Sequence, residues 1–292
     1  MDAFAQEAAE VRAEVFNETA AKMGIGAPII IEKDFWVCWA LKRVFELEAP
    51  KASIIFKGGT SLSKAYGAIH RFSEDIDLSL DRADLGFSGE TDPANENLSN
   101  NQRKALLKDL SEISADTVQG SLKAAIQSQM QSALPSMEIE LLVGDDDPQT
   151  LIFNYPASLP PPPGGAYLQD KVKLEFGARS DHLPAETRTV TAYAAQEFPD
   201  VISEVDVMVN TLSIERTFWE KATVLHMLHH MPDEEDLGKN MSRHYYDMSQ
   251  LASLDVRDTA LGNLELLAKV ADHKTRFLQP HGLNTAKLGH QR

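Results

Sequence analysis

A pair of glycines at positions 58 and 59 separates two segments of different character. The run before it, SIIFK at 53–57, is short, apolar and β-branched, which is typical of a buried strand. The residues after it favour a helix to about residue 69, and Thr60 or Ser61 can cap its start. The alternating residues at 76–80 predict a second strand. This part of the chain is therefore expected to run as strand, turn, helix, loop and strand.

The glycine turn has the composition of an anion site. Gly58 and Gly59 let the backbone approach a ligand with no Cβ in the way. The free N–H groups and the positive dipole end of the following helix point back at the turn. Thr60 and Ser61 add hydroxyl donors, and Lys64 lies one helical turn further on. We therefore expect this segment to bind the phosphates of a nucleotide.

Two aspartates begin the second strand, in the motif DID. Asp75 and Asp77 are two residues apart, so on a strand they project from the same side while Ile76 enters the core. Two carboxylates this close repel each other and are tolerated when a divalent cation lies between them. Mg²⁺ (or Mn²⁺) combines few protein carboxylates with substrate phosphates. The pattern therefore predicts metal-dependent phosphoryl or nucleotidyl transfer.

Each half of this pattern is common by itself. A glycine pair before a helix is usually only a turn, and an isolated D-x-D is usually a solvated strand or loop. The combination of glycines, hydroxyls, one helix and D-x-D at a strand start is far less ordinary. A P-loop would need G-x-x-x-x-G-K-[ST], which this sequence lacks, and no Rossmann fingerprint is present in this segment.

The charge distribution allows a cationic cleft in an acidic protein. The formal charge is −16, from 28 basic and 44 acidic residues, so the chain is not expected to coat nucleic acid non-specifically. The basic residues nevertheless gather in three groups, which would form a cationic surface if they converge in space. The groups are Lys57, Lys64, His70 and Arg71; Lys171, Lys173, Arg179 and His182; and Arg216, Lys221, Arg243 and His244.

The order of elements predicts an α+β fold in which a mixed sheet is flanked by helices. We expect a domain boundary near residue 210. Residues 1–210 would form the core, with N-terminal helices and a helical insertion, and residues 211–292 a helical C-terminal region that completes the nucleotide cleft. Helices are expected at 1–23, 32–47, 60–69, 102–134, 213–230, 242–254 and 256–273, and strands at 53–57, 76–80, 137–143, 151–155, 171–176, 187–192 and 205–209.

The sequence also predicts a reduced, cytoplasmic location. No apolar run approaches the ~20 residues of a membrane span, and the N-terminus lacks the features of a secretory signal. The single cysteine, Cys38, excludes an intrachain disulfide, and its apolar neighbours (FWVCWAL) indicate a buried thiol. The proline-rich segment at 160–165 is expected to be a connecting loop.

The sequence resembles one family over most of its length. Its stretches GGTSLSKAY and RFSEDIDL are similar to the signature of AbiEii/AbiGii-type toxins, which are relatives of the MenT toxins in the polymerase-β-like nucleotidyltransferase superfamily. Further likeness lies in four segments. They are IEKDFWVCWAL (Ile31–Leu41), VKLEFGAR (Val172–Arg179), ERTFWEKATVLH (Glu215–His226) and RHYYDM (Arg243–Met248). Residues 82–135 and 274–292 match nothing recognisable.

This resemblance implies further site residues. The superfamily usually supplies a third carboxylate from a neighbouring strand, and Glu175 is the candidate, so the metal ligands would be Asp75, Asp77 and Glu175. Asp170, at the strand's start, is a weaker candidate. Three more sets of residues follow from the resemblance and from helix spacing. They are Lys173 and Lys221 as phosphate ligands, Arg71 and Arg179 for phosphate or acceptor, and Arg243 paired with Asp247 as support.

A zinc site is a weaker reading of the same region. His226, His229 and His230 share one face of the expected helix, but no cysteine cluster or H-E-x-x-H motif accompanies them. We therefore expect a polar helix end there rather than a metal site.

The resemblance implies a toxin that transfers a nucleotide from an NTP to an RNA acceptor, the 3′ end of tRNA in MenT-like relatives. It also implies an AbiEi-like antitoxin, which in such systems acts without a stable complex, and no contact with a membrane. Two alternatives remain open. The acceptor could be a protein hydroxyl, or the chain could be a non-catalytic GTP-binding module. Intact Asp75 and Asp77 argue against the second. The sequence does not name the NTP, the acceptor or the oligomeric state.

Overall fold

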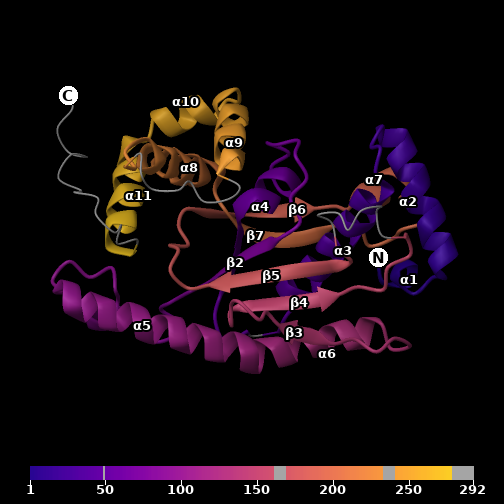
Figure 1. Ribbon diagram of the computed structural model, residues 1–292, viewed down its shortest axis with the longest axis horizontal. Coiled ribbons are helices and arrows are strands. Elements are labelled where there is room, and N and C mark those ends of the chain that lie inside the picture. Colours follow the sequence, from indigo (N-terminus) through magenta and orange to yellow (C-terminus); the bar gives the residue numbers. More distant parts are fainter. Residues whose placement is uncertain (49, 161–168, 233–240, 278–292) are drawn as a thin grey trace.

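A mixed sheet of seven strands forms the centre of the molecule, in the order β3-β4-β5-β2-β1-β7-β6 (Figure 1). The computed structural model describes residues 1–48, 50–160, 169–232 and 241–277. The strands are β1 (Ile54–Lys57), β2 (Ile76–Leu80), β3 (Leu141–Val143), β4 (Thr150–Asn154), β5 (Lys171–Gly177), β6 (Ala185–Val190) and β7 (Val207–Leu212). This mixed sheet with flanking helices confirms the predicted α+β class.

The pairing of the central strands determines which residues meet. β1 is antiparallel to β2, and β2 is parallel to β5. Lys57 at the end of β1 therefore lies opposite Asp77, and Asp77 lies opposite Glu175 on the other side. Three charged residues thus form a row across the middle of the sheet, although they are far apart in the sequence.

Helices surround the sheet in three groups (Figure 1). The N-terminal helices and the C-terminal helices lie toward opposite ends of it, and the α5–α6 rod runs along one side. The helices are α1 (Asp2–Ala5), α2 (Ala9–Met23), α3 (Pro28–Phe45), α4 (Gly58–Lys64), α5 (Asn100–Thr117), α6 (Lys123–Ala133), α7 (Tyr193–Glu197), α8 (Ile214–His229), α9 (Ser242–Ala252), α10 (Val256–Leu261) and α11 (Leu264–Phe277), with a 3-10 turn at Gly89–Thr91 and a π turn at Val118–Leu122.

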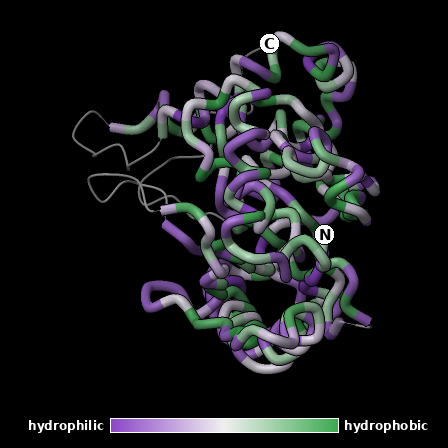
Figure 2. Tube along the Cα trace, turned by 90° about the vertical axis from the view of Figure 1, so that its right-hand side faces the viewer, coloured by the Kyte–Doolittle hydropathy of each residue, from purple (hydrophilic) through white to green (hydrophobic). Residues whose placement is uncertain are grey.

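The main core lies between the sheet and helix α3. Trp36 and Trp39 of α3 are fully buried, and their rings contact Phe153 of β4 at 5.9 and 5.5 Å. Cys38 is buried in the same helix as a free thiol, as predicted. Figure 2 shows apolar and polar residues interleaved along the chain, as expected for elements with one buried and one exposed face.

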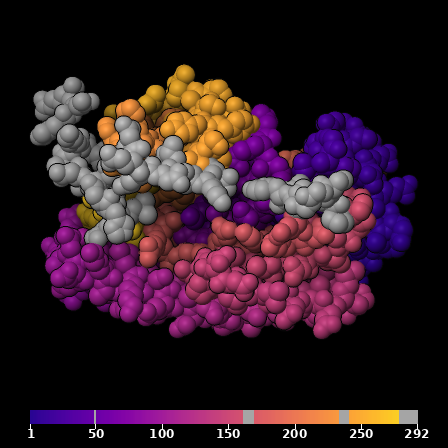
Figure 3. Space-filling model, viewed as in Figure 1, coloured from indigo at the N-terminus to yellow at the C-terminus, as the bar shows by residue number. Residues whose placement is uncertain are grey.

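A second, smaller core joins α4 to the C-terminal helices. It contains Leu62 of α4, Trp219 of α8, Leu251 of α9 and Val270 of α11. The C-terminal helices therefore pack on the helix that follows the glycine pair. The space-filling view shows a hollow between these helices and the half of the sheet that carries β4 and β5 (Figure 3). The boundary predicted near residue 210 stays a prediction.

Several elements differ in length from the sequence prediction. The helix expected to run to residue 69 ends at Lys64, and Gly67 beyond it has a φ of 58°, which a right-handed helix excludes. The helix expected over 256–273 is divided at Gly262, after which the Asn263 side chain accepts a hydrogen bond from the Leu266 N–H. The loop expected at 160–165 lies, from residue 161 onward, outside the described residues. In the described part of the chain no helix could span a membrane.

Candidate active site

The turn at Gly58 is shaped by the protein's own carboxylate. Gly58 has a φ of 78°, and a Cβ built on it would lie 1.8 Å from Oδ2 of Asp77. A Cβ on Gly59 would lie 2.7 Å from the Arg71 guanidinium and 2.9 Å from the Ser73 hydroxyl. We expected these glycines to make room for a ligand. The structure shows instead that side chains of the following loop and strand fill the space. Gly58 therefore requires glycine, whereas a side chain at position 59 would have to displace the ends of the Arg71 and Ser73 side chains.

The two hydroxyls after the glycine pair also have internal partners. Thr60 and Ser61 are fully buried. The Thr60 hydroxyl donates to the carbonyl of Asp75, and the Ser61 hydroxyl donates to the carbonyl of Gly58 at 2.9 Å. Each hydroxyl therefore holds the backbone beside a site residue, rather than presenting a free donor as predicted.

Lys64 does not point toward the carboxylates either. Its ammonium group lies 2.7 Å from Asp34 of α3 and 3.7 Å from the centre of the Tyr193 ring. Both partners of the ion pair are buried, and Asp34 also accepts a hydrogen bond from the backbone N–H of Tyr193 at 2.7 Å. The Lys64 ammonium therefore points to α3 and not back toward the glycine turn, which contradicts the position that we predicted for it. A buried lysine needs such a carboxylate partner to offset the loss of hydration.

The acids meet where β2 lies between β1 and β5. Asp75 directly precedes β2, and Asp77 lies in register between Lys57 and Glu175. Burial raises the pKa of Glu175 to about 7, and the carboxylates of Asp75 and Asp77 add to the increase. Lys173, on the same face of β5, opposes it. The charges of Asp75 and Asp77 therefore make ionisation of Glu175 more costly.

Neighbouring charges shift the pKa of Asp77 in opposite directions. Burial raises the pKa of Asp77, Lys57 opposes that change, and Asp75 adds to it. The cations of Arg243 and Lys221 also lower the pKa of Asp77, which places both of them within electrostatic reach of the acids. The site thus combines a group of mutually repelling carboxylates with cations from β1, α8 and α9.

The donor chemistry of this group fits a divalent cation that arrives with its substrate. Among the described residues no group of three or more His, Cys, Asp or Glu forms a ready-made metal cage. Mg²⁺ needs no such cage, because it keeps water and takes substrate phosphate oxygens beside one or two carboxylates. A cation next to Asp75, Asp77 and Glu175 would offset the repulsion that raises the pKa of Glu175.

A buried ionic network lies beside the acids. Asp247 of α9 is fully buried and receives two hydrogen bonds from Arg71, at 2.7 and 2.8 Å, and one from Lys221 at 2.8 Å. Burial raises the pKa of Asp247, but these donors more than offset that effect, so its pKa is lowered. The network ties the loop after α4 to α8 and α9.

Arg243 and Arg179, two of the predicted site residues, are both exposed. We expected Arg243 to pair with Asp247 on one helix face, but Asp247 is paired with Arg71 and Lys221, and Arg243 is exposed. Arg179 is exposed as well, and its carbonyl accepts a hydrogen bond from His273 at 2.8 Å. Their roles toward phosphate or acceptor stay predictions.

The histidines at the end of α8 and Asp170 were also considered as site residues. The rings of His226 and His229 both contact His230, at 4.4 and 4.9 Å, at the end of α8. Asp170, the weaker candidate for a third acid, precedes β5, and Glu175 alone of the two pairs in register with Asp77.

The sequence reading missed the function of the charges in α3. Its segment Glu32-Lys33-Asp34 is buried. Glu32 accepts hydrogen bonds from Ser158 and Leu159, Lys33 pairs with Glu74, and Asp34 pairs with Lys64. Three consecutive charged residues within an otherwise apolar helix could have indicated from the sequence that these charges are buried and paired. They connect the core to loops on either side of the acids.

Comparison with known protein families gives a match over most of the chain. A family model described as the nucleotidyl transferase AbiEii toxin of type IV toxin–antitoxin systems matches residues 39–290. Among solved structures, MenT4, a nucleotidyltransferase toxin from Mycobacterium tuberculosis H37Rv, is similar with 16% identity and a TM-score of 0.47. The match covers 92% of this chain and 76% of MenT4. No curated protein sequence matches the chain.

The family match defines the class of the protein, which is a nucleotidyltransferase. The chain belongs to the AbiEii family, the toxins of type IV toxin–antitoxin systems. The resemblance predicted from the glycine and aspartate motifs is thereby confirmed.

Proposed function

We propose that the protein transfers a nucleotide from an NTP to a hydroxyl of RNA in a reaction that depends on Mg²⁺. The observation that carries this proposal is the row formed by Lys57, Asp77 and Glu175 across three strands, with Asp75 beside it. Neighbouring carboxylates with raised pKa values suit a cation, and nearby lysines suit phosphates.

The residues have distinct parts in the proposed reaction. Asp75, Asp77 and Glu175 would hold the divalent cation, which when bound would lower the pKa of the attacking hydroxyl and offset charge on the leaving pyrophosphate. The hydroxyl oxygen would bond to the α-phosphorus while the bond from that phosphorus to the α–β bridging oxygen breaks, so that pyrophosphate leaves and the hydroxyl proton passes to water. Lys57 and Lys221 would bind the phosphates, and Asp247 holds Lys221 in place. Lys173 and Arg243 are further candidates for contacts with phosphate or acceptor.

The acceptor that we propose is RNA, with the 3′ end of tRNA as the first candidate. The likeness to MenT-type toxins and the cations of Lys173, Arg71 and Arg243 support it. NTPs and tRNA are cytoplasmic, so the reaction would take place there. An AbiEi-like antitoxin is the implied partner, and a stable complex with it is not required.

Incubation with each labelled NTP, Mg²⁺, and either total RNA or total protein tests the proposal. Label from at least one NTP on tRNA supports it. Label on protein alone, with every tRNA unmodified, would show instead that the enzyme modifies a protein hydroxyl. Binding of GTP without any transfer would indicate the non-catalytic module.

A further inference from the structure

Lys274, in the last turn of α11, extends the cationic side of the site. Its ammonium group donates a hydrogen bond to the carbonyl of Glu220 at 2.6 Å, directly beside Lys221. Burial lowers the pKa of Lys274 to about 8, and Glu220 opposes this, while Lys221 and Lys57 lower it further. Lys57 of β1 and Lys221 of α8 are therefore both within electrostatic reach of Lys274.

The last turn of α11 is fixed to the rest of the protein on both sides of Lys274. His273 lies 3.6 Å from Asp181, and Arg276 lies 3.0 Å from Glu96 and also donates to the carbonyl of Ala94. Phe277 is buried, with the guanidinium of Arg82 5.0 Å from its ring centre. The contacts of His273, Arg276 and Phe277 thus fix the backbone that carries Lys274.

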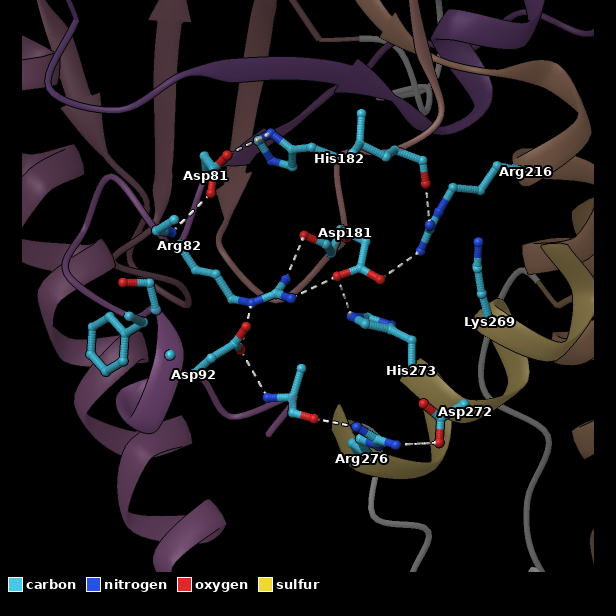
Figure 4. Close-up of a pocket in the computed structure, with 17 residues that line it drawn as sticks. Asp81, Arg82, Asp92, Asp181, His182, Arg216, Lys269, Asp272, His273 and Arg276 are labelled. Carbon is cyan, nitrogen blue, oxygen red and sulfur yellow. Dashed lines mark hydrogen bonds and ion pairs between the residues drawn. The ribbon is translucent and has the colours of Figure 1, made fainter. Parts of the chain in front are cut away.

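Asp181 is the centre of this attachment (Figure 4). It accepts from Arg82 at 2.8 Å and from Arg216 at 3.3 Å, and it faces His273. The cavity around it measures 510 Å³, and the charges that line it are joined largely to one another. These pairs connect α11 to the loops after β2 and β5, so we assign the cavity a structural role.

Lys274 itself lacks a matched anion. Within the described ranges no carboxylate forms an ion pair with it or with Lys57, and Lys221 shares its carboxylate with Arg71. Like charges in a partly desolvated place raise the free energy of the empty site. A bound polyphosphate would offset that cost, because its oxygens accept charge-assisted hydrogen bonds from ammonium groups.

We propose that Lys274 binds the polyphosphate tail of the NTP together with Lys57 and Lys221, which makes α11 a wall of the nucleotide site. This inference rests on the proposed function in one respect, namely that the tail belongs to an NTP substrate. Among the described residues Lys274 forms no ion pair with Asp75, Asp77 or Glu175, and its ammonium group is held at the Glu220 carbonyl of α8, next to Lys221. We therefore assign it to the leaving pyrophosphate rather than to the reacting α-phosphate.

Direct binding measurements on the full chain test this assignment. We expect Lys274→Met to weaken binding of NTP and of inorganic pyrophosphate by roughly 10- to 100-fold, the range for a charge-assisted hydrogen bond. Binding of the nucleoside monophosphate should be unchanged, and Lys274→Arg should restore most of the affinity. Lys269→Met is the matched control, because Lys269 lies on the same helix, pairs with Glu265 and is exposed. It should leave all three affinities unaltered.

The outcomes separate this inference from the proposed function. Equal NTP affinity in Lys274→Met and in the wild type overturns the inference, whether or not transfer occurs. An equal loss for NTP, pyrophosphate and monophosphate also overturns it, since that result indicates a structural lysine. If Lys274→Met does not fold, Lys274→Arg and Lys274→Gln are compared, and equal pyrophosphate affinity in both counts against the inference. If Lys274→Met selectively loses binding of NTP and pyrophosphate while the wild type transfers no nucleotide, the result supports the inference and refutes the proposed function.

Discussion

At the scale of single residues, the glycine pair makes room for other side chains of the protein itself. Gly58 leaves the space that the Asp77 carboxylate occupies, and Gly59 leaves space for Arg71 and Ser73. Sequence reasoning correctly placed Asp75 and Asp77 near the glycines, because the D-x-D spacing and the short connection are local features. It could not show that the glycines accommodate protein side chains, because that depends on pairing between β1 and β2.

Replacing Gly58 by alanine should therefore impair catalysis as well as folding. The new Cβ would collide with Asp77 and would also occupy a φ of 78°, so we expect transfer to fall strongly and stability to decrease by more than ~1 kcal/mol. The matched control is Gly67→Ala, whose φ is 58° but whose Cβ would have no neighbour within 4 Å. It should lose ~1 kcal/mol without a change in activity per folded molecule. Normal transfer by Gly58→Ala would refute this role. Thermal melting and transfer assays make both comparisons.

Glu175 shows a second limit of reasoning at this scale. The alternating sequence predicted which face of the strand Glu175 occupies, and β5 does alternate between buried and half-buried positions. Its position opposite Asp77 is a matter of long-range register, which no local pattern contains. The family resemblance, rather than the spacing, was what suggested it.

At the scale of elements, buried ion pairs connect the helices that surround the site. The four-residue helical spacing favoured a pair between Arg243 and Asp247. In the folded protein Asp247 instead accepts hydrogen bonds from Arg71 and Lys221. Lys64 likewise was expected to reach the turn before its own helix, and α3 supplies its partner instead. Sequence patterns predict which face of a helix a charge occupies, but not which neighbour lies there.

The Asp247 network should give stability that depends on pH in a defined direction. Its pKa in the folded protein is below the usual value, so its contribution is present above about pH 4 and is lost as the pH falls through the lowered pKa. Asp247→Asn should cost ~3 kcal/mol at neutral pH and reduce this acid-dependent loss. Denaturant unfolding at several pH values measures both effects.

Asp258→Asn provides the comparison for Asp247→Asn. Asp258 also pairs with an arginine, Arg257, but both side chains are exposed, so the free energy of unfolding should hardly change. Equal effects of the two substitutions would contradict the distinction between a buried network and a surface pair.

The Lys64–Asp34 pair should behave as a structural element. Lys64→Met leaves a buried carboxylate without its partner, and we expect a loss of ~3–5 kcal/mol in the free energy of unfolding. The double variant Lys64→Met/Asp34→Leu should recover much of that loss and should bind NTP as the wild type does. If the double variant is stable but no longer binds NTP, then Lys64 is a nucleotide ligand after all.

At the scale of the whole molecule, two cores meet around the acids. The sheet and α3 form one, and α4 with the C-terminal helices forms the other. The α+β class and the long α5–α6 helix were predictable, because periodicity over many residues marks them. The way in which α11 returns to the loops after β2 and β5 was not, because it depends on single contacts such as Arg276 with Glu96.

The same arrangement explains how an acidic chain can present a cationic site. The formal charge is −16, yet Lys274 is held at the carbonyl next to Lys221, and Lys57 lies within electrostatic reach of Lys274. Lys64, which the sequence grouped with Lys57, pairs with Asp34 instead. The whole-chain charge describes the surface in general and says little about the chemistry of one cleft.

The central claim is that Asp75 and Asp77 hold the catalytic cation, and replacing each with asparagine tests it most directly. Burial and the Asp75 charge raise the pKa of Asp77, so its ionised form costs stability at pH 7, and Asp77→Asn should melt at the same temperature or slightly higher. Transfer by either variant should fall by several orders of magnitude, and Mg²⁺ should no longer shift melting in the presence of NTP. Variants that melt early but transfer normally when folded would contradict the claim.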